Sequence, residues 1–150
     1  MDVIIIGTDP PCPRCDILGL WVDEVIAEND HKASIKVAHL SFNDPAAIDF
    51  GAKKGLIIGT AKQIALSAGI DFDKAKLEEW TSKRILEIDE YNRPADIWNE
   101  EFDHMLSQYQ KAADGISFLM TPVLVIDGVV KHHGSVPKKA QLRKWIEESV

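Results

Sequence analysis

The hydrophobic pattern divides the chain into two ends that mix strands with helices and a middle with helical periodicity. The apolar run over 2–7 predicts a buried strand, and its three consecutive isoleucines are typical of a strand covered on both faces. From Cys15 to about Asn29, apolar residues recur at helical spacing. Residues 34–40 alternate partly and predict a second strand. These elements predict a βαβ unit with parallel strands.

The middle of the chain carries only helical patterns. Apolar positions recur so that each long helix has one stripe to bury. Pro45 suits the first turn of a helix, Gly69 suits a helix end and Asp73 suits an N-cap. We therefore expect helices over 45–52, 56–68, 74–90 and 95–113.

The last third returns to strands. Residues 122–126 predict a strand, and the Asp127-Gly128 pair that follows is a strong hairpin signal. Residues 129–133 then form the antiparallel partner, and an amphipathic helix around Leu142 ends the chain. The predicted order is β-α-β, a helical block, then β-β-α, which defines an α/β fold.

The length and charge of the chain argue against several classes of function. A chain of 150 residues predicts one domain. Its net charge of −7 disfavours both nucleic acid, which is bound through many Lys and Arg contacts, and anionic membrane surfaces. No apolar stretch approaches the roughly 18 residues of a membrane span, and the start has no pattern of a secretory signal. We therefore expect a cytoplasmic protein that binds neither nucleic acid nor membrane.

The only two cysteines stand in the motif Cys12-Pro13-Arg14-Cys15, where the first strand gives way to the first helix. Two thiols at this spacing can close and open a disulfide with little backbone movement. Because structural disulfides are rare in the cytosol, the pair is predicted to be catalytic, redox-sensing or metal-binding.

Each residue of the motif has an expected role. Cys12 is the candidate nucleophile, since unpaired N–H groups at a helix start and the cation of Arg14 both favour a thiolate. Cys15, one turn further in, is the candidate resolving thiol that attacks the mixed disulfide. Pro13 has a fixed φ that suits the first helical turn.

This element order, with a Cys pair at the first strand–helix junction, resembles the thioredoxin fold. Thr121-Pro122 before the last hairpin and helix adds to the resemblance, which is nearest to glutaredoxin-like and DsbA-like oxidoreductases. It implies a single domain over 1–150, with a core at 1–42 and 117–150. The intervening part, about 43–116, is then an all-helical insertion between the second strand and the cis-proline strand.

The resemblance also implies details of the site. The Thr121–Pro122 bond is expected to be cis and to face the Cys pair, which leaves the Thr121 backbone free to bind an extended substrate. The acid that the family carries on strand one, a proton acceptor for the second Cys, falls near Ile6 and is absent. Asp9 is interpreted as an ordinary acidic residue in a loop. The spacing of His39 from other residues indicates no functional motif.

The expected function is a thiol–disulfide oxidoreductase that acts on a disulfide-containing protein or a low-molecular-weight thiol. An unidentified reductase would regenerate it, and it needs no cofactor beyond the Cys12–Cys15 disulfide. One alternative is a dithiol that holds a soft metal, with His132 and His133 or a second subunit completing the site. The other is a thioredoxin-like interaction scaffold with incidental cysteines.

Overall fold

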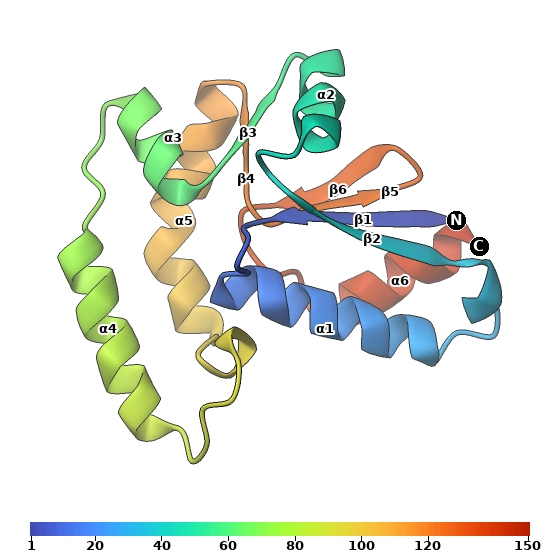
Figure 1. The fold of residues 1–150 in the computed structure, drawn as a ribbon, viewed down its shortest axis with the longest axis horizontal. Helices are drawn as coiled ribbons and strands as arrows, with labels where there is room; N and C mark the ends of the chain where they lie inside the picture. The colour runs from blue at the N-terminus through green and yellow to red at the C-terminus, as the bar shows by residue number, and fades with distance from the viewer.

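A four-stranded mixed sheet forms the centre of the protein, in a computed structural model that describes all 150 residues (Figure 1). The strand order is β2-β1-β5-β6. β1 pairs parallel with β2 and antiparallel with β5, and β5 pairs antiparallel with β6. The two ends of the chain therefore meet along β1 and β5. The strands are β1 (Asp2–Gly7), β2 (Lys36–Ser41), β5 (Val123–Ile126) and β6 (Val129–His133).

Helices cover both faces of this sheet. On one face lie α1 (Pro13–Ala27) and α6 (Lys139–Ser149), and on the other lies α2 (Pro45–Lys53) (Figure 1). Val3 and Ile5 of β1 pack into the core with α1 and α6, whereas Ile6 packs with Ala47 of α2. Burial on both faces explains why β1 consists of a continuous apolar run.

The β5–β6 hairpin has the turn that its sequence predicts. Asp127 and Gly128 have φ values of 48° and 79°, and positive φ at both central positions is typical of the tight turn that Asp-Gly favours. The Asp127 carboxylate also accepts a hydrogen bond of 2.8 Å from the Asp2 amide. This bond joins the turn to the start of β1.

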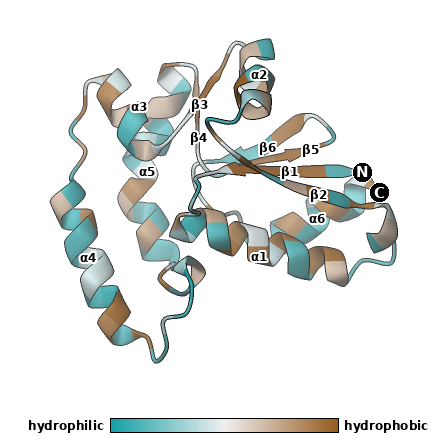
Figure 2. Ribbon diagram, in the orientation of Figure 1, coloured by the Kyte–Doolittle hydropathy of each residue, from teal (hydrophilic) through white to brown (hydrophobic).

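A helical lobe packs beside the sheet around a second core. Phe102, Leu106 and Tyr109 of α5 pack there with Ile64 of α3 and with Met120. Figure 2 shows α4 as mostly hydrophilic, and none of its residues is buried. None of the helices combines the length and hydrophobicity that crossing a bilayer requires. The lobe contains α3 (Ala61–Ala68), α4 (Lys74–Glu87), α5 (Glu100–Gly115) and the 3₁₀ turn η2 (Pro94–Asp96), and a second 3₁₀ turn, η1 (Lys32–Ser34), precedes β2.

The block between β2 and the cis-proline strand is not all helical. β3 (Ile57–Gly59) and β4 (Phe118–Met120) form a separate two-stranded parallel sheet. The helix expected over 56–68 is therefore wrong in its first part, and β4 was not predicted. A strand of three residues is too short to show a pattern of its own, so it can be assigned only from its pairing with another strand. The partner of β3 lies far along the chain.

Two further helix boundaries differ from the prediction by three residues or more. α5 begins at Glu100 instead of 95, because the Asn99 side chain accepts a hydrogen bond of 3.1 Å from the Phe102 amide and so caps the helix there. Residues 94–96, which start at a proline, form η2 instead. α4 ends at Glu87 rather than at 90.

The core assignment can be tested with two leucines on helices. Leu18 of α1 is fully buried, and Leu86 of α4 is 86% exposed. Leu18→Ala should lower the free energy of unfolding by about 2–5 kcal/mol through lost burial and a residual cavity. Leu86→Ala should change it by less than about 0.5 kcal/mol. Urea unfolding followed by circular dichroism measures both, and equal losses would contradict the packing described here.

Candidate active site

Cys12 lies at the N-terminus of α1, just beyond the end of β1. It is the N-cap residue, and its sulfur accepts a hydrogen bond of 3.3 Å from the Cys15 amide. Pro13 occupies the first turn, as expected. The sulfur therefore stands where free amide groups and the positive end of the helix dipole stabilise an anion.

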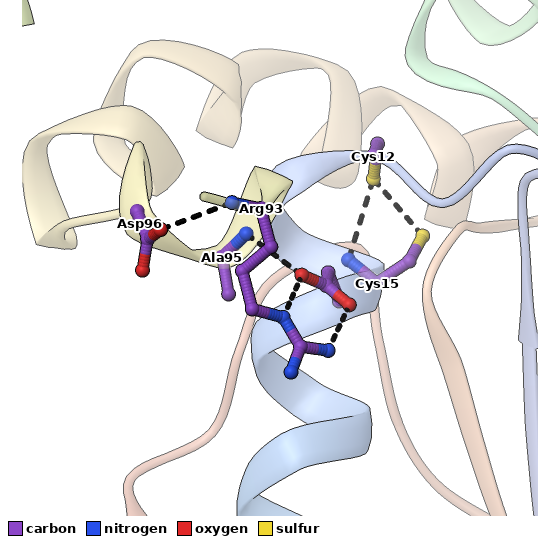
Figure 3. Close-up of polar contacts among 6 residues, drawn as sticks. Cys12, Cys15, Arg93, Ala95 and Asp96 are labelled. Carbon is purple, nitrogen blue, oxygen red and sulfur yellow. Dashed lines mark hydrogen bonds and ion pairs between the residues drawn. The ribbon is translucent and has the colours of Figure 1, made fainter. Parts of the chain in front are cut away.

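The two thiols form a close pair with unequal access. Their Sγ atoms lie 2.9 Å apart, and both cysteines are free (Figure 3). Cys12 is half-buried, whereas Cys15 is buried. Cys12 is therefore the more accessible residue of the pair.

Hydrogen bonding separates the acidities of the two thiols. The Cys15 thiol donates to the Cys12 sulfur, which is the largest cause that lowers the pKa of Cys12 to about 6. Burial opposes this shift, and the Arg14 charge adds to it. The same hydrogen bond, together with burial, raises the pKa of Cys15 far above its ordinary value. Near neutral pH the pair therefore consists of a Cys12 thiolate that accepts a hydrogen bond from a Cys15 thiol.

Arg14 is a fixed, buried cation. Its guanidinium donates a hydrogen bond of 2.6 Å to the Gly134 carbonyl, and the residue is only 5% exposed. Its charge favours the Cys12 thiolate. Burial raises the pKa of Asp103 on α5, and the Arg14 charge partly opposes that shift. The sequence indicated a cation in the motif but not its contact with the distant Gly134.

Thr8 and Gly7 belong to the site, although no local pattern in the sequence predicts a role for them. The Thr8 hydroxyl accepts a hydrogen bond of 2.9 Å from the Cys12 amide and lies 3.9 Å from the Cys15 sulfur. A Cβ atom on Gly7 would lie 2.8 Å from the Cys15 sulfur. Only glycine lets β1 approach Cys15 so closely. The one sequence feature that could have indicated their role is their position between the first strand and the Cys motif.

The Thr121–Pro122 bond is cis, and Thr121 lines the same cavity as Cys12. The Thr121 amide donates a hydrogen bond of 3.0 Å to the Gly59 carbonyl. The expectation that the Thr121 backbone is free for a substrate is therefore wrong for its N–H group. Gly59 belongs to β3, a strand that the sequence pattern does not predict, and its carbonyl already accepts that group's hydrogen bond.

The Asp16 carboxylate connects the helical lobe to the site through hydrogen bonds. Asp16, in the first turn of α1, accepts hydrogen bonds of 2.8 and 2.6 Å from the Arg93 guanidinium and one of 2.9 Å from the Ala95 amide. Figure 3 labels these two donor residues near the cysteines. The bonds from Arg93 are the main reason why the pKa of Asp16 is lowered. They hold the connection between α4 and α5 beside the cysteines.

The two sulfurs border different cavities. Cys12 lines a cavity of about 420 Å³ between α1 and the three helices of the lobe, with apolar side chains such as Leu77 and Ile97 in its wall. Cys15 lines a second cavity of about 460 Å³, which also contains Asp9 and His39. The first wall is the more apolar of the two, and the second is rich in ionisable groups.

The histidines of β6 have partners of their own. His132 lies 2.7 Å from the Ser135 hydroxyl. His133 accepts a hydrogen bond of 3.1 Å from the Met120 amide and lies 3.0 Å from Asp114. No three or more His, Cys, Asp or Glu side chains are grouped so that they could hold a metal ion.

Comparison with known proteins supports the fold. A family model described as "Thioredoxin domain" matches residues 95–147, less than half of the chain. No curated protein and no solved structure matches the chain. The matched region contains β4, the β5–β6 hairpin and most of α6. With the mixed α/β architecture and the Cys pair at the start of α1, it identifies the chain as a thioredoxin-fold protein.

The acidity of Cys12 gives a direct test of the site. Alkylation by iodoacetamide should rise with pH through a midpoint near 6, because only the thiolate reacts. Cys15→Ala should move this midpoint toward the ordinary thiol value, and Arg14→Gln should move it less. Lys62→Gln, which removes another cation beside the same cavity, should leave it in place. A larger shift in Arg14→Gln than in Cys15→Ala would show that charge dominates over the hydrogen bond.

Proposed function

We propose that the protein is a thiol–disulfide oxidoreductase. One observation carries the proposal: an accessible sulfur with a lowered pKa lies 2.9 Å from a buried, protonated partner at a helix start. The first thiol is thus prepared to attack, and the second is within reach of the product of that attack. The Thioredoxin domain match supports a redox role.

The reaction proceeds in two steps. The Cys12 thiolate attacks a sulfur of the substrate disulfide, and the substrate S–S bond breaks as the other sulfur leaves as a thiolate. Cys15 then loses its proton and attacks Cys12, which forms the Cys12–Cys15 disulfide and releases the second substrate thiolate. The dithiol gives up two electrons, and a reductase or a low-molecular-weight thiol restores it.

The other residues of the motif prepare the first step. Arg14 stabilises the thiolate through its charge, and its guanidinium is held in place by the hydrogen bond to the Gly134 carbonyl. Pro13 shapes the first turn that presents the Cys12 sulfur. The chemistry requires no bound cofactor besides the two sulfurs. We expect the protein to act in the cytoplasm, where cellular reductants keep thiols reduced and could regenerate the dithiol.

The cavity beside Cys12 is the proposed substrate site. Its wall combines apolar side chains from the lobe with Thr121 from the cis-proline segment. Such a lining favours disulfides that carry an apolar group near the sulfur, whether on a protein or on a small molecule. Because the Thr121 amide is occupied, we expect side-chain burial to contribute more to substrate binding than added strand pairing.

Substitution of each cysteine tests the proposed reaction. Cys12→Ser should abolish reduction of insulin and of glutathione disulfide, because the attacking sulfur is gone. Cys15→Ser should keep the first step and accumulate a mixed disulfide that mass spectrometry detects. Unchanged reduction in Cys12→Ser would support the scaffold alternative. A metal retained through purification, released by a chelator and lost in Cys12→Ser would support the metal-binding alternative.

The substrate cavity can be tested separately from the thiols. Leu77, half-buried on α4, lines the cavity, whereas Leu86 on the same helix is 86% exposed. Leu77→Gln should raise KM for an aromatic disulfide roughly three- to tenfold, because part of an apolar contact worth about 1.5–3 kcal/mol is lost. Leu86→Gln should leave KM unchanged. Equal KM values in both variants and the wild type would place substrate binding elsewhere.

A further inference from the structure

The second step of the proposed reaction needs a proton acceptor for Cys15. The thiol is buried, and both burial and its hydrogen bond to Cys12 raise its pKa far above the ordinary value. It attacks only after losing the proton. The residues of β1 on the side of α1 supply no acid, because Val3 and Ile5 are apolar and Gly7 has no side chain. The acceptor must therefore come from another element.

Two glycines shape the cavity that Cys15 lines. A Cβ atom on Gly7 of β1 would lie 2.8 Å from the Cys15 sulfur. A Cβ atom on Gly19 of α1 would lie 3.0 Å from the His39 ring. The missing side chains let α1 lie close to β1 and β2 while leaving a cavity of about 460 Å³. A volume of this size holds several water molecules, each of which occupies about 30 Å³ in the liquid.

His39 lies on the same side of the sheet as Cys15. In the parallel register His39 pairs with Ile5, which faces α1, and the alternation of β1 puts Gly7 on that face as well. Cys15 contacts Gly7, and His39 contacts Gly19, one helical turn after Cys15. One turn of a helix rises about 5.4 Å, so Cys15 and the site of the His39 contact are neighbours along α1, and both residues line the same cavity.

We propose that His39 accepts the proton of Cys15 through water in this cavity when Cys15 attacks the mixed disulfide. The assignment rests on the proposed function. Imidazole is the side chain that ordinarily exchanges a proton near neutral pH. His39 is also exposed, so it can pass the proton on to solvent.

Atoms and electrons balance in this step. The proton moves from the Cys15 sulfur through water to an imidazole nitrogen of His39. The Cys15 sulfur then forms a bond to the Cys12 sulfur, and the bond between Cys12 and the substrate sulfur breaks with its electron pair going to the substrate. The dithiol is oxidised by two electrons, and the substrate disulfide is reduced to two thiols.

The other ionisable groups of the cavity are less suited to the role. Asp16 is held by Arg93 and Ala95, and Asp44 accepts a hydrogen bond of 2.8 Å from the Ser41 amide. Asp23 stands two turns beyond Cys15 on α1, and its charge acts on Arg93. Asp9, in the exposed loop before the motif, is the remaining competitor.

A chromogenic aromatic disulfide separates the two steps. With the protein in excess over the thionitrobenzoate disulfide, attack by Cys12 releases the first coloured thiolate, and attack by Cys15 releases the second. Cys15→Ser identifies the second phase by abolishing it. His39→Asn should slow the second phase roughly 100-fold or more near neutral pH, as expected for loss of a proton acceptor. It should leave the first phase and the Cys12 alkylation profile unchanged.

Two controls distinguish a proton acceptor from a structural residue. His31→Asn, at an exposed histidine before η1, should leave both phases unchanged. In His39→Ala, added imidazole should restore the second phase, since a small base can enter the cavity. A purely structural role would give no such rescue.

The remaining outcomes overturn the assignment. A slow second phase in Asp9→Asn with a normal one in His39→Asn would make Asp9 the acceptor. An unaffected second phase in both variants would show that solvent alone deprotonates Cys15. Equal slowing of both phases without imidazole rescue would make His39 structural. If the wild type lacked the second phase altogether, the proposed function would fail together with this inference, a result unlike the other three.

Discussion

The hydrogen bonding around the Cys12 sulfur is the interaction on which the site depends. The Cys15 amide and the Cys15 thiol both donate to it at the start of α1. A charged sulfur that is half-buried would otherwise lose solvation without compensation. The same bond that favours a Cys12 anion keeps the proton on Cys15. In the proposed reaction, this one contact therefore assigns attack and resolution to different sulfurs.

The rest of the fold keeps these donors in place and separates the two sides of the pair. β1 brings Gly7 against the Cys15 sulfur, and Asp16 holds the α4–α5 connection against the first turn of α1. The helical lobe thus forms an apolar wall beside Cys12, while the gap between α1 and β2 forms a polar cavity beside Cys15. In the proposed reaction, the substrate and the departing proton would then use different sides of the Cys pair.

Local patterns predicted the elements whose signals lie within a few residues. The apolar run of β1, the helical spacing of α1 and the Asp127-Gly128 turn all depend on neighbouring residues, and the structure has them where expected. β3 and β4 escaped prediction because each is three residues long and is stabilised by the other, far along the chain. The error reached the site, since the Thr121 amide that appeared free belongs to that pairing.

The sequence by itself determined that two thiols would stand one turn apart at a helix start, because their spacing and Pro13 act within a single turn. It also determined the order of the strands and helices that make a thioredoxin fold. Only the tertiary structure decided that Arg14 is buried against Gly134, and that Cys15 shares a cavity with His39. Those contacts join segments that are distant in the chain, so no local pattern of residues specifies them.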